Sequence, residues 1–248
     1  TIVERDRKGN LKFLRHDASP SELPAALLAN ANLERAKMTG AVAMQADFTD
    51  AIMRGCKLTR ANLRQACLQG ANLENADLQG CDLAGANLKG AVLTGARMNG
   101  ASIDGADMAG VMTDAPFGTA LDALAMPIGK LLEEHSLWVE SEGAEGKPIS
   151  LAGADLRPLQ SLTHLNLTAL SAPGAVFYGL NLEGVKMQGA QLQNADLRTA
   201  KLQGADLRGA NLRDAKLSNA DLRDCNLGPL LINGDRLMPT QLNGAQLR

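Results

Sequence analysis

The sequence predicts a repeat solenoid with a narrow core, and three observations support this prediction. Apolar residues recur at every fifth position over most of the chain, as in the consecutive units 71–75, 76–80 and 81–85. A period of five fits neither the α-helix, which repeats every 3.6 residues, nor the β-strand, which repeats every two. Aromatic residues make up only 2% of the 248 residues, so small and medium side chains must line the core. Self-similarity at a fixed period over this length is typical of solenoids.

Each unit has five slots, which we call small, polar, large, fourth and fifth. The large slot keeps one phase from Leu33 to Met108, and Leu23 and Leu28 extend it backwards. The fifth slot is often glycine, which suits a corner that needs an unusual backbone conformation. We therefore expect a first array over residues 21–115, preceded by an N-terminal extension or cap over residues 1–20.

A second array is expected over residues 149–248. One extra residue enters near Pro158, after which the large slot keeps its phase through Ile232 and Leu237 to Leu247. The two arrays are out of phase with each other, so a segment of another kind must separate them.

That segment, residues 116–148, is expected to be a helical linker or cap. Proline at position 127 suits the first position of a helix. Apolar residues and one histidine then recur at helical spacing on one face: Ile128, Leu131, Leu132, His135, Trp138 and Val139. The face with Trp138 is expected to cover the open end of the second array, and the alternative is that it binds a partner.

The units 205–209, Ala-Asp-Leu-Arg-Gly, and 210–214, Ala-Asn-Leu-Arg-Asp, closely resemble the consensus of the pentapeptide-repeat family, known from bacteria. The resemblance covers residues 21–115 and 149–248. It implies an all-β solenoid, a right-handed quadrilateral β-helix with four units per turn, whose small and large slots point inward. Here the β-helix is expected as two stacked or angled arrays, interrupted by a short α-helical segment.

The slot assignment makes two further predictions. Six large residues should line the core: Phe48, Leu73, Leu83, Phe177, Leu207 and Leu212. With four units per turn, residues twenty apart should be vertical neighbours. Lys201 then lies next to Asp221 and Lys186 next to Asp206, so that opposite charges alternate within a column.

Apolar residues in the polar slot are candidates for an interaction surface. Ile52, Val92 and Met112 are separated by multiples of twenty and should form one apolar column on an outer face. Leu231 occupies a polar slot in the second array. Such a column either docks another part of the chain or binds a partner. With Trp138, these residues form the predicted surface.

Charge and composition argue against several functions. The net charge is −2, so no global field attracts nucleic acid or an acidic membrane. Arg198, Arg208, Arg213 and Arg223 fall on four different faces, whereas a nucleic-acid site would gather them on one. The histidines at positions 16, 135 and 164 share no metal-ligand spacing. We expect no catalytic, cofactor-binding or metal-binding residues, and no membrane span.

Four cysteines read as free thiols. Cys56, Cys81 and Cys225 occupy the small slot, where cysteine acts as a small apolar residue, and Cys67 occupies the polar slot. No Cys-x-x-Cys pair occurs. A reducing, cytoplasmic location is the simplest expectation.

The predicted function is that of a non-enzymatic scaffold that presents a rigid surface to an unidentified protein partner. The family resemblance adds an alternative, a DNA mimic that protects or inhibits DNA gyrase. Such mimics are strongly acidic, whereas residues 149–248 hold ten Lys and Arg against eight Asp and Glu. A third possibility is a structural section of a larger protein. An uncapped coil end would also allow a homodimer.

Overall fold

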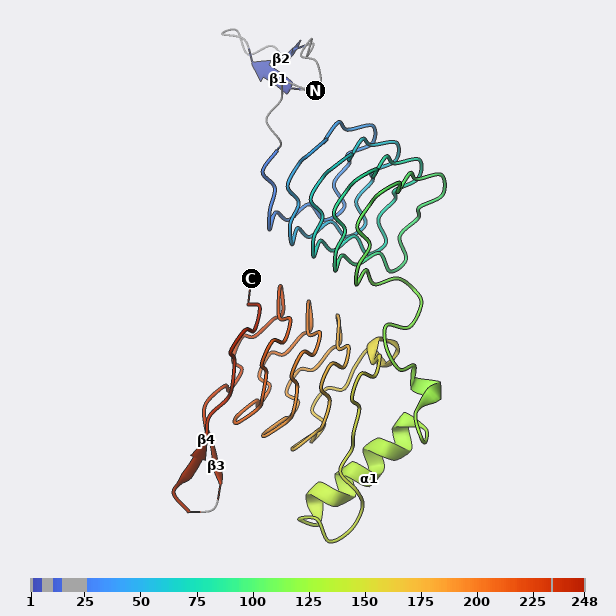
Figure 1. Ribbon diagram of the computed structural model, residues 1–248. Coiled ribbons are helices and arrows are strands. Elements are labelled where there is room, and N and C mark those ends of the chain that lie inside the picture. The colour runs from blue at the N-terminus through green and yellow to red at the C-terminus, as the bar shows by residue number, and fades with distance from the viewer. Residues whose placement is uncertain (1, 6–10, 15–25, 233, 248) are drawn as a thin grey trace. The chain divides into compact units, whose positions relative to one another are not determined.

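The computed structural model describes residues 2–5, 11–14, 26–232 and 234–247. The chain divides into two compact units, Thr1–Asp114 and Ala115–Arg248, and each contains one stack of coils (Figure 1). The segment between the two arrays belongs to the second unit. Residues 21–25, where the first array was expected to begin, lie outside the described residues.

Four five-residue units make one coil in both arrays. Parallel bridges join residues twenty apart, such as Asn32 with Ile52 and Asn72 with Val92. Two backbone hydrogen bonds flank a typical bridge, from Leu73 N–H to Val92 O at 2.8 Å and from Val92 N–H to Ala71 O at 2.9 Å. A tight turn follows most bridges. The coils therefore satisfy each other's backbone groups, as neighbouring strands of a sheet do.

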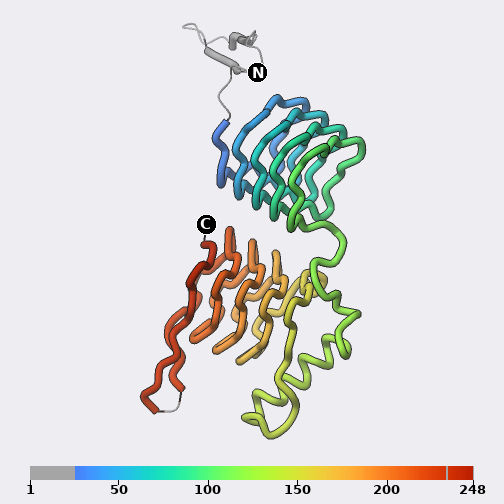
Figure 2. The backbone as a smooth tube through the Cα atoms, in the orientation of Figure 1, coloured from blue at the N-terminus to red at the C-terminus, as the bar shows by residue number. Residues whose placement is uncertain are grey.

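The core of each array consists of the small and large slots. The first core runs from Ala46 to Leu93 and the second from Ile149 to Leu217, and both consist mainly of alanine and leucine. The structure buries all six predicted core residues: Phe48, Leu73, Leu83, Phe177, Leu207 and Leu212. Figure 2 shows how narrow each coil is, which explains why so few aromatic rings are needed.

The corners explain the glycines of the fifth slot. Gly70 has φ of +69°, in the left-handed region, and a Cβ added there would clash with Asp50 Oδ1 of the preceding coil. Gly90 has nearly the same φ, +68°, but its Cβ position is open. Asp50 itself also has a positive φ, of 55°. A corner side chain in one coil thus takes the space that a glycine leaves free in the next.

The N-terminal extension contains two short strands, β1 (Ile2–Arg5) and β2 (Leu11–Leu14). They pair antiparallel, with Ile2 opposite Leu14 and Arg5 opposite Leu11.

A helix covers the start of the second array. After a short 3-10 helix (Leu121–Ala123), α1 (Ile128–Glu140) begins directly after Pro127. Ile128, Leu131 and Leu132 pack against the core of the second array. The helix ends where the Ser141 N–H donates to Leu137 O at 2.9 Å.

One extra residue enters the first coil of the second array, as the sequence predicts. The bridge from Asp155 to Val176 spans 21 residues, whereas the bridge from Ser161 to Asn181 spans 20. The second 3-10 helix (Arg157–Leu159) lies between the two bridges and accommodates the insertion.

A second insertion was not expected. Strands β3 (Leu230–Ile232) and β4 (Arg236–Met238) pair as a hairpin that leaves the last coil (Figure 2). Asn211 bridges to Gln241, thirty residues on, so the hairpin adds ten residues to this coil. The prediction that Ile232 and Leu237 fill large slots is therefore wrong. The phase survives because ten is a multiple of five.

Candidate interaction surface

The predicted apolar column of the first array is not an exposed surface. Ile52 is half-buried, while Val92 is 1% and Met112 0% exposed. The bridges place Val92 between Asn72 and Met112 in one ladder. Removing a valine or methionine side chain from water is favourable by roughly 1.5–3 kcal/mol, which explains why these apolar side chains lie buried. The prediction that Val92 and Met112 offer a partner surface is wrong.

Leu231 is exposed, but it lies in the hairpin and not in a polar slot. It pairs across the strands with Leu237, and the two side chains are 61% and 58% exposed. Leu237 is also part of this surface, although the five-residue pattern of the sequence assigns it to a large slot. Two leucines side by side on a protruding hairpin form the apolar surface that we call the leucine pair.

The opposite face of the hairpin is anchored to the array. Leu230 and Met238, the neighbouring cross-strand pair, lie against Gly189 and Gly209. A Cβ on Gly209 would lie 2.7 Å from Leu230 Cβ and 2.9 Å from Met238 Cε. The hairpin can therefore pack against the array only where these corner positions, 189 and 209, are glycine.

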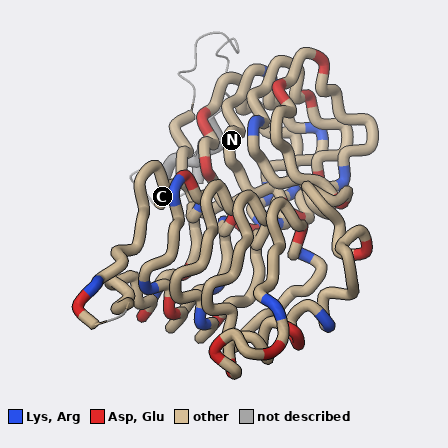
Figure 3. The backbone as a smooth tube through the Cα atoms, turned by 60° about the horizontal axis from the view of Figure 1, so that its bottom comes forward, with Lys and Arg blue, Asp and Glu red and all other residues tan. Residues whose placement is uncertain are grey.

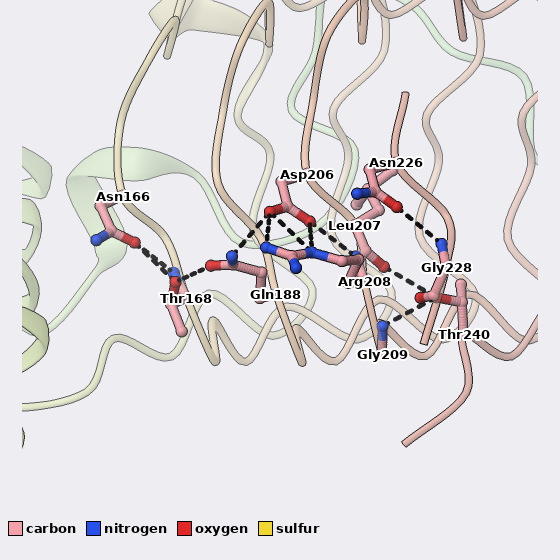
Figure 4. A network of polar contacts seen from close by, with 10 residues as sticks. All are labelled: Asn166, Thr168, Gln188, Asp206, Leu207, Arg208, Gly209, Asn226, Gly228 and Thr240. Atoms are coloured by element: carbon pink, nitrogen blue, oxygen red, sulfur yellow. Dashed lines mark hydrogen bonds and ion pairs between the residues drawn. The ribbon is translucent and has the colours of Figure 1, made fainter. Parts of the chain in front are cut away.

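Thr240 closes the base of the hairpin. Its hydroxyl accepts the Gly209 N–H at 2.9 Å and lies 3.0 Å from Gly228 O and 3.1 Å from Leu207 O (Figure 4). These contacts join Thr240, two residues after β4, to the preceding coil and to Gly228, two residues before β3.

A ladder of polar side chains runs along the same array face (Figure 4). The Thr168 hydroxyl lies 2.7 Å from Asn166 Oδ1 and 2.9 Å from Gln188 Oε1. Gln188 Nε2 donates to Asp206 Oδ2 at 2.8 Å, and Arg208 Nε donates to Asp206 Oδ1 at 2.9 Å. The ladder crosses three coils, so it fixes the side chains beside the hairpin in one arrangement.

Each arginine in an Asp-Leu-Arg unit folds back on its own aspartate. Asp196 binds Arg198 at 2.7 Å, and Asp206 binds Arg208 at the same distance. The five-residue pattern predicts these arginines in a solvated outer slot and Asp206 next to Lys186. The bridges do make Lys186 and Asp206 vertical neighbours, but the ion pair forms within the unit. The spacing Asp-x-Arg is the sequence feature that indicates these ion pairs.

These pairs shift the pKa of the carboxyl groups. The Arg223 guanidinium hydrogen-bonds Asp221 and holds its pKa down at about 2, from an ordinary value of 3.8. Because the folded value is the lower one, the pair contributes stability above pH 3.8 and loses it as the pH falls towards 2. Charges of both signs alternate over the coils, and none of these arginines forms an unpaired basic stripe (Figure 3).

Asp155 and Arg157 hold the entry to the second array. Asp155 Oδ2 accepts the Phe117 N–H at 2.9 Å, and Arg157 donates to Ala115 O at 3.0 Å. Burial raises the pKa of Asp155, but hydrogen bonds from Arg157 and from the Phe117 N–H outweigh it, so the pKa is lowered.

Trp138 is half-buried on α1 and does not project freely from the helix. Its ring stacks on His135, with centroids 5.7 Å apart and an interplanar angle of 21°. This packing leaves only part of the indole available to a partner.

The repeats establish the family of the chain. A model described as pentapeptide repeats matches eight copies, over residues 26–65, 56–94, 71–110, 161–198 and 190–228. The chain belongs to the pentapeptide-repeat family. The resemblance stated from the sequence is confirmed, and the fold is the right-handed β-helix solenoid of that family.

Several solved pentapeptide-repeat structures are similar to the chain. HetL, involved in heterocyst differentiation regulation in the cyanobacterium Nostoc sp., is 26% identical over 87% of this chain and 88% of its own, with a TM-score of 0.34. A protein from the Arabidopsis thaliana thylakoid lumen is 22% identical over 48% of this chain and 81% of its own, with a TM-score of 0.35. Full-length QnrB1, a plasmid-mediated fluoroquinolone resistance protein, is 19% identical over 90% and 92%, with a TM-score of 0.23. A comparison with curated proteins finds no match.

The cysteines of this pentapeptide-repeat protein should differ in reactivity. Burial raises the pKa of Cys81 and of Cys225 to about 11 and also raises that of Cys56, whereas Cys67 is partly exposed. The thiolate is the reactive form. In the folded protein at pH 8, iodoacetamide should therefore label Cys67 first, as read by peptide mass spectrometry. Labelling of Cys81 at the same rate would contradict the buried slot.

Two further features bear on function. No group of three metal-binding side chains occurs among the described residues. Within the same residues, no helix combines the length and the apolar character that a membrane crossing requires.

Proposed function

We propose that this pentapeptide-repeat protein is a non-enzymatic scaffold for protein–protein interaction, and that the hairpin of β3 and β4 carries the binding surface. The observation that supports this most is the leucine pair, which places two large apolar side chains in water on a protruding element. Exposed apolar patches of this kind are typical of interaction sites. We also propose a quadrilateral cross-section for the coils, supported by the four units per coil, and a cytoplasmic location, supported by the four free cysteines.

The surroundings of the leucine pair suit binding by a preformed surface. Leu230 and Met238 anchor the hairpin from its other face, and Thr240 ties its base to two coils. A side chain held on an anchored element loses little conformational entropy when it binds, which favours affinity. The polar ladder beside the hairpin could supply the hydrogen-bonding rim that surrounds an apolar centre in many interfaces.

A pull-down from the native host tests this proposal. The baits are the wild-type chain, the double variant Leu231→Ser/Leu237→Ser, and a chain in which one glycine replaces residues 229–239. The replacement removes the hairpin and keeps the five-residue phase from Leu227 to Leu242. Val42→Ser is the matched control, because Val42 is also 61% exposed but lies in the first array.

We expect at least one protein to bind the wild type and Val42→Ser and to be lost from both hairpin variants. Mass spectrometry of the bound fraction identifies it. The same proteins on all four baits, or none on any, would contradict the hairpin as the binding surface.

A DNA-gyrase supercoiling assay separates this proposal from the DNA-mimic alternative. DNA mimicry needs a strongly acidic surface, whereas the net charge is −2 and the Asp-Leu-Arg pairs neutralise several carboxylates. We expect no inhibition or protection of gyrase. A clear effect at equimolar chain would favour the DNA mimic.

A further inference from the structure

His135 is the buried titratable group at the contact between α1 and the second array. It is 1% exposed, on a helix whose remaining inner face is apolar. Its Nδ1 accepts the backbone N–H of Ile149 at 3.1 Å. The carbonyl of the same residue accepts the Ser171 N–H at 3.2 Å, so Ile149 joins the helix to the first coil.

This hydrogen bond requires a neutral imidazole. An Nδ1 that accepts a hydrogen bond carries no proton, so the ring proton sits on Nε2. Nε2 is buried, and it forms no hydrogen bond of good geometry among the described residues, although the Thr168 backbone lies close enough to favour a proton on the ring. The ring also stacks on Trp138. Protonation would place an N–H on Nδ1 against the Ile149 N–H, so that two donors would face each other.

Among the residues that the structure describes, no carboxylate compensates for a charge on His135. The groups placed against the ring are the Trp138 indole, the Ile149 N–H and the backbone of Thr168, and none of these titrates. Neighbouring ionisable residues are Glu134 on the helix and Glu145 and Lys147 on the following loop, and the last two are exposed. Burial lowers the pKa of His135 below 6.5, and the Thr168 backbone opposes this only in part.

The loop after the helix is attached to α1. The Lys147 N–H donates to Glu134 O at 3.1 Å, and the Glu145 N–H donates to Ser141 Oγ at 2.8 Å. The last turns of the helix and residues 141–148 would therefore move together if the contact to Ile149 were lost.

We propose that His135 is a proton-sensitive latch, and that its protonation at Nδ1 by a proton from solvent releases the C-terminal half of α1 with residues 141–148 from the second array. The direction of the pH effect follows from the lowered pKa of His135. The unfolded or released state binds the proton more tightly than the docked state, so docking is fully stable above pH 6.5 and weakens as the pH falls below it. Within that window the docking constant falls up to tenfold per pH unit.

Two readouts on the full chain test the latch. Trp138 is the one tryptophan of the sequence, so intrinsic fluorescence between pH 8 and 4.5 reports on the ring that stacks on His135. Hydrogen exchange, expressed as protection factors to remove the intrinsic pH dependence, compares peptides over 135–149 with peptides over 190–215 in the array core. His135→Asn keeps an acceptor oxygen but cannot be protonated, and the exposed His164→Asn is the matched control.

We expect one fluorescence transition with a midpoint below pH 6.5, accompanied by a loss of protection of about tenfold per pH unit over 135–149 only. It should persist in His164→Asn and be absent in His135→Asn. A midpoint at or above 6.5, unchanged protection over 135–149, or the same transition in His135→Asn would overturn the latch. If His135→Asn fails to fold, the wild-type midpoint and the comparison of the two peptide sets still decide.

Discussion

Leu207→Asp should abolish folding of the second array or destabilise it by more than about 5 kcal/mol, whereas Arg208→Asp should cost far less. Leu207 is fully buried, so the substitution removes a core side chain, typically worth 2–5 kcal/mol, and also buries a carboxylate without a partner. The Arg208 side chain is partly exposed. Its replacement breaks the pair with Asp206 and adds a like charge, but water screens both effects.

Urea and thermal denaturation followed by circular dichroism measure this difference. Leu207→Ala provides a variant that should fold and lose about 2–5 kcal/mol, in case Leu207→Asp does not fold at all. Equal falls in Tm for Leu207→Asp and Arg208→Asp would contradict the slot assignment on which the fold description depends.

Gly209→Ala should detach the hairpin from its seat, and Gly204→Ala should not. Both glycines have φ of +67°, so both variants suffer the same backbone cost, about 1–2 kcal/mol for an L-residue in this region. They differ in their surroundings. The new Cβ at Gly209 would overlap Leu230 and Met238, whereas nothing lies within 4 Å of the Cβ position at Gly204.

Trypsin cleavage after Arg236, which lies exposed in β4, reports directly on the hairpin. We expect Gly209→Ala to be cleaved there at least about tenfold faster than Gly204→Ala, which corresponds to an additional 1.4 kcal/mol of local destabilisation. Equal cleavage of the two variants would show that the corner glycines do not hold the hairpin.

The architecture of the arrays could be predicted because the five-residue period is a physical constraint on the core. Each unit must place one small and one large side chain inside a narrow tube. A single inserted residue, such as the one near Pro158, therefore shifts the slot of every later residue. That insertion was therefore visible in the sequence. The hairpin was not, because an insertion of ten residues leaves the phase of Leu242 unchanged.

The candidate surface was predicted less well, for a related reason. A slot assignment says which way a side chain points from its own coil, and it does not say what covers that face. Val92 and Met112 point away from the core of their coils, yet they are buried. The five-residue pattern predicts Leu231 as an exposed apolar residue in a polar slot. The exposure is correct, but the slot is not, because Leu231 lies in the hairpin. Leu237, its cross-strand partner, is predicted in the core instead.

The pairing of Arg208 with Asp206 does not follow from columns of residues twenty apart, because both residues belong to one unit. The turn after each bridge brings the fourth-slot side chain back over the polar slot of the same unit, where a guanidinium can bind both carboxylate oxygens. A local rule, aspartate two residues before arginine, would have found this pair and the three others like it.

After the hairpin the chain returns to the five-residue register, and this affects how the sequence of such a protein can diverge. The coils on either side of the hairpin pair in the same five-residue register, because an insertion of ten residues leaves that register unchanged. On the proposed function, the residues that bind a partner and the residues that form the core lie in separate stretches of the sequence, so the hairpin can change while the core stays the same. The same property makes this corner a practical place to graft a foreign loop.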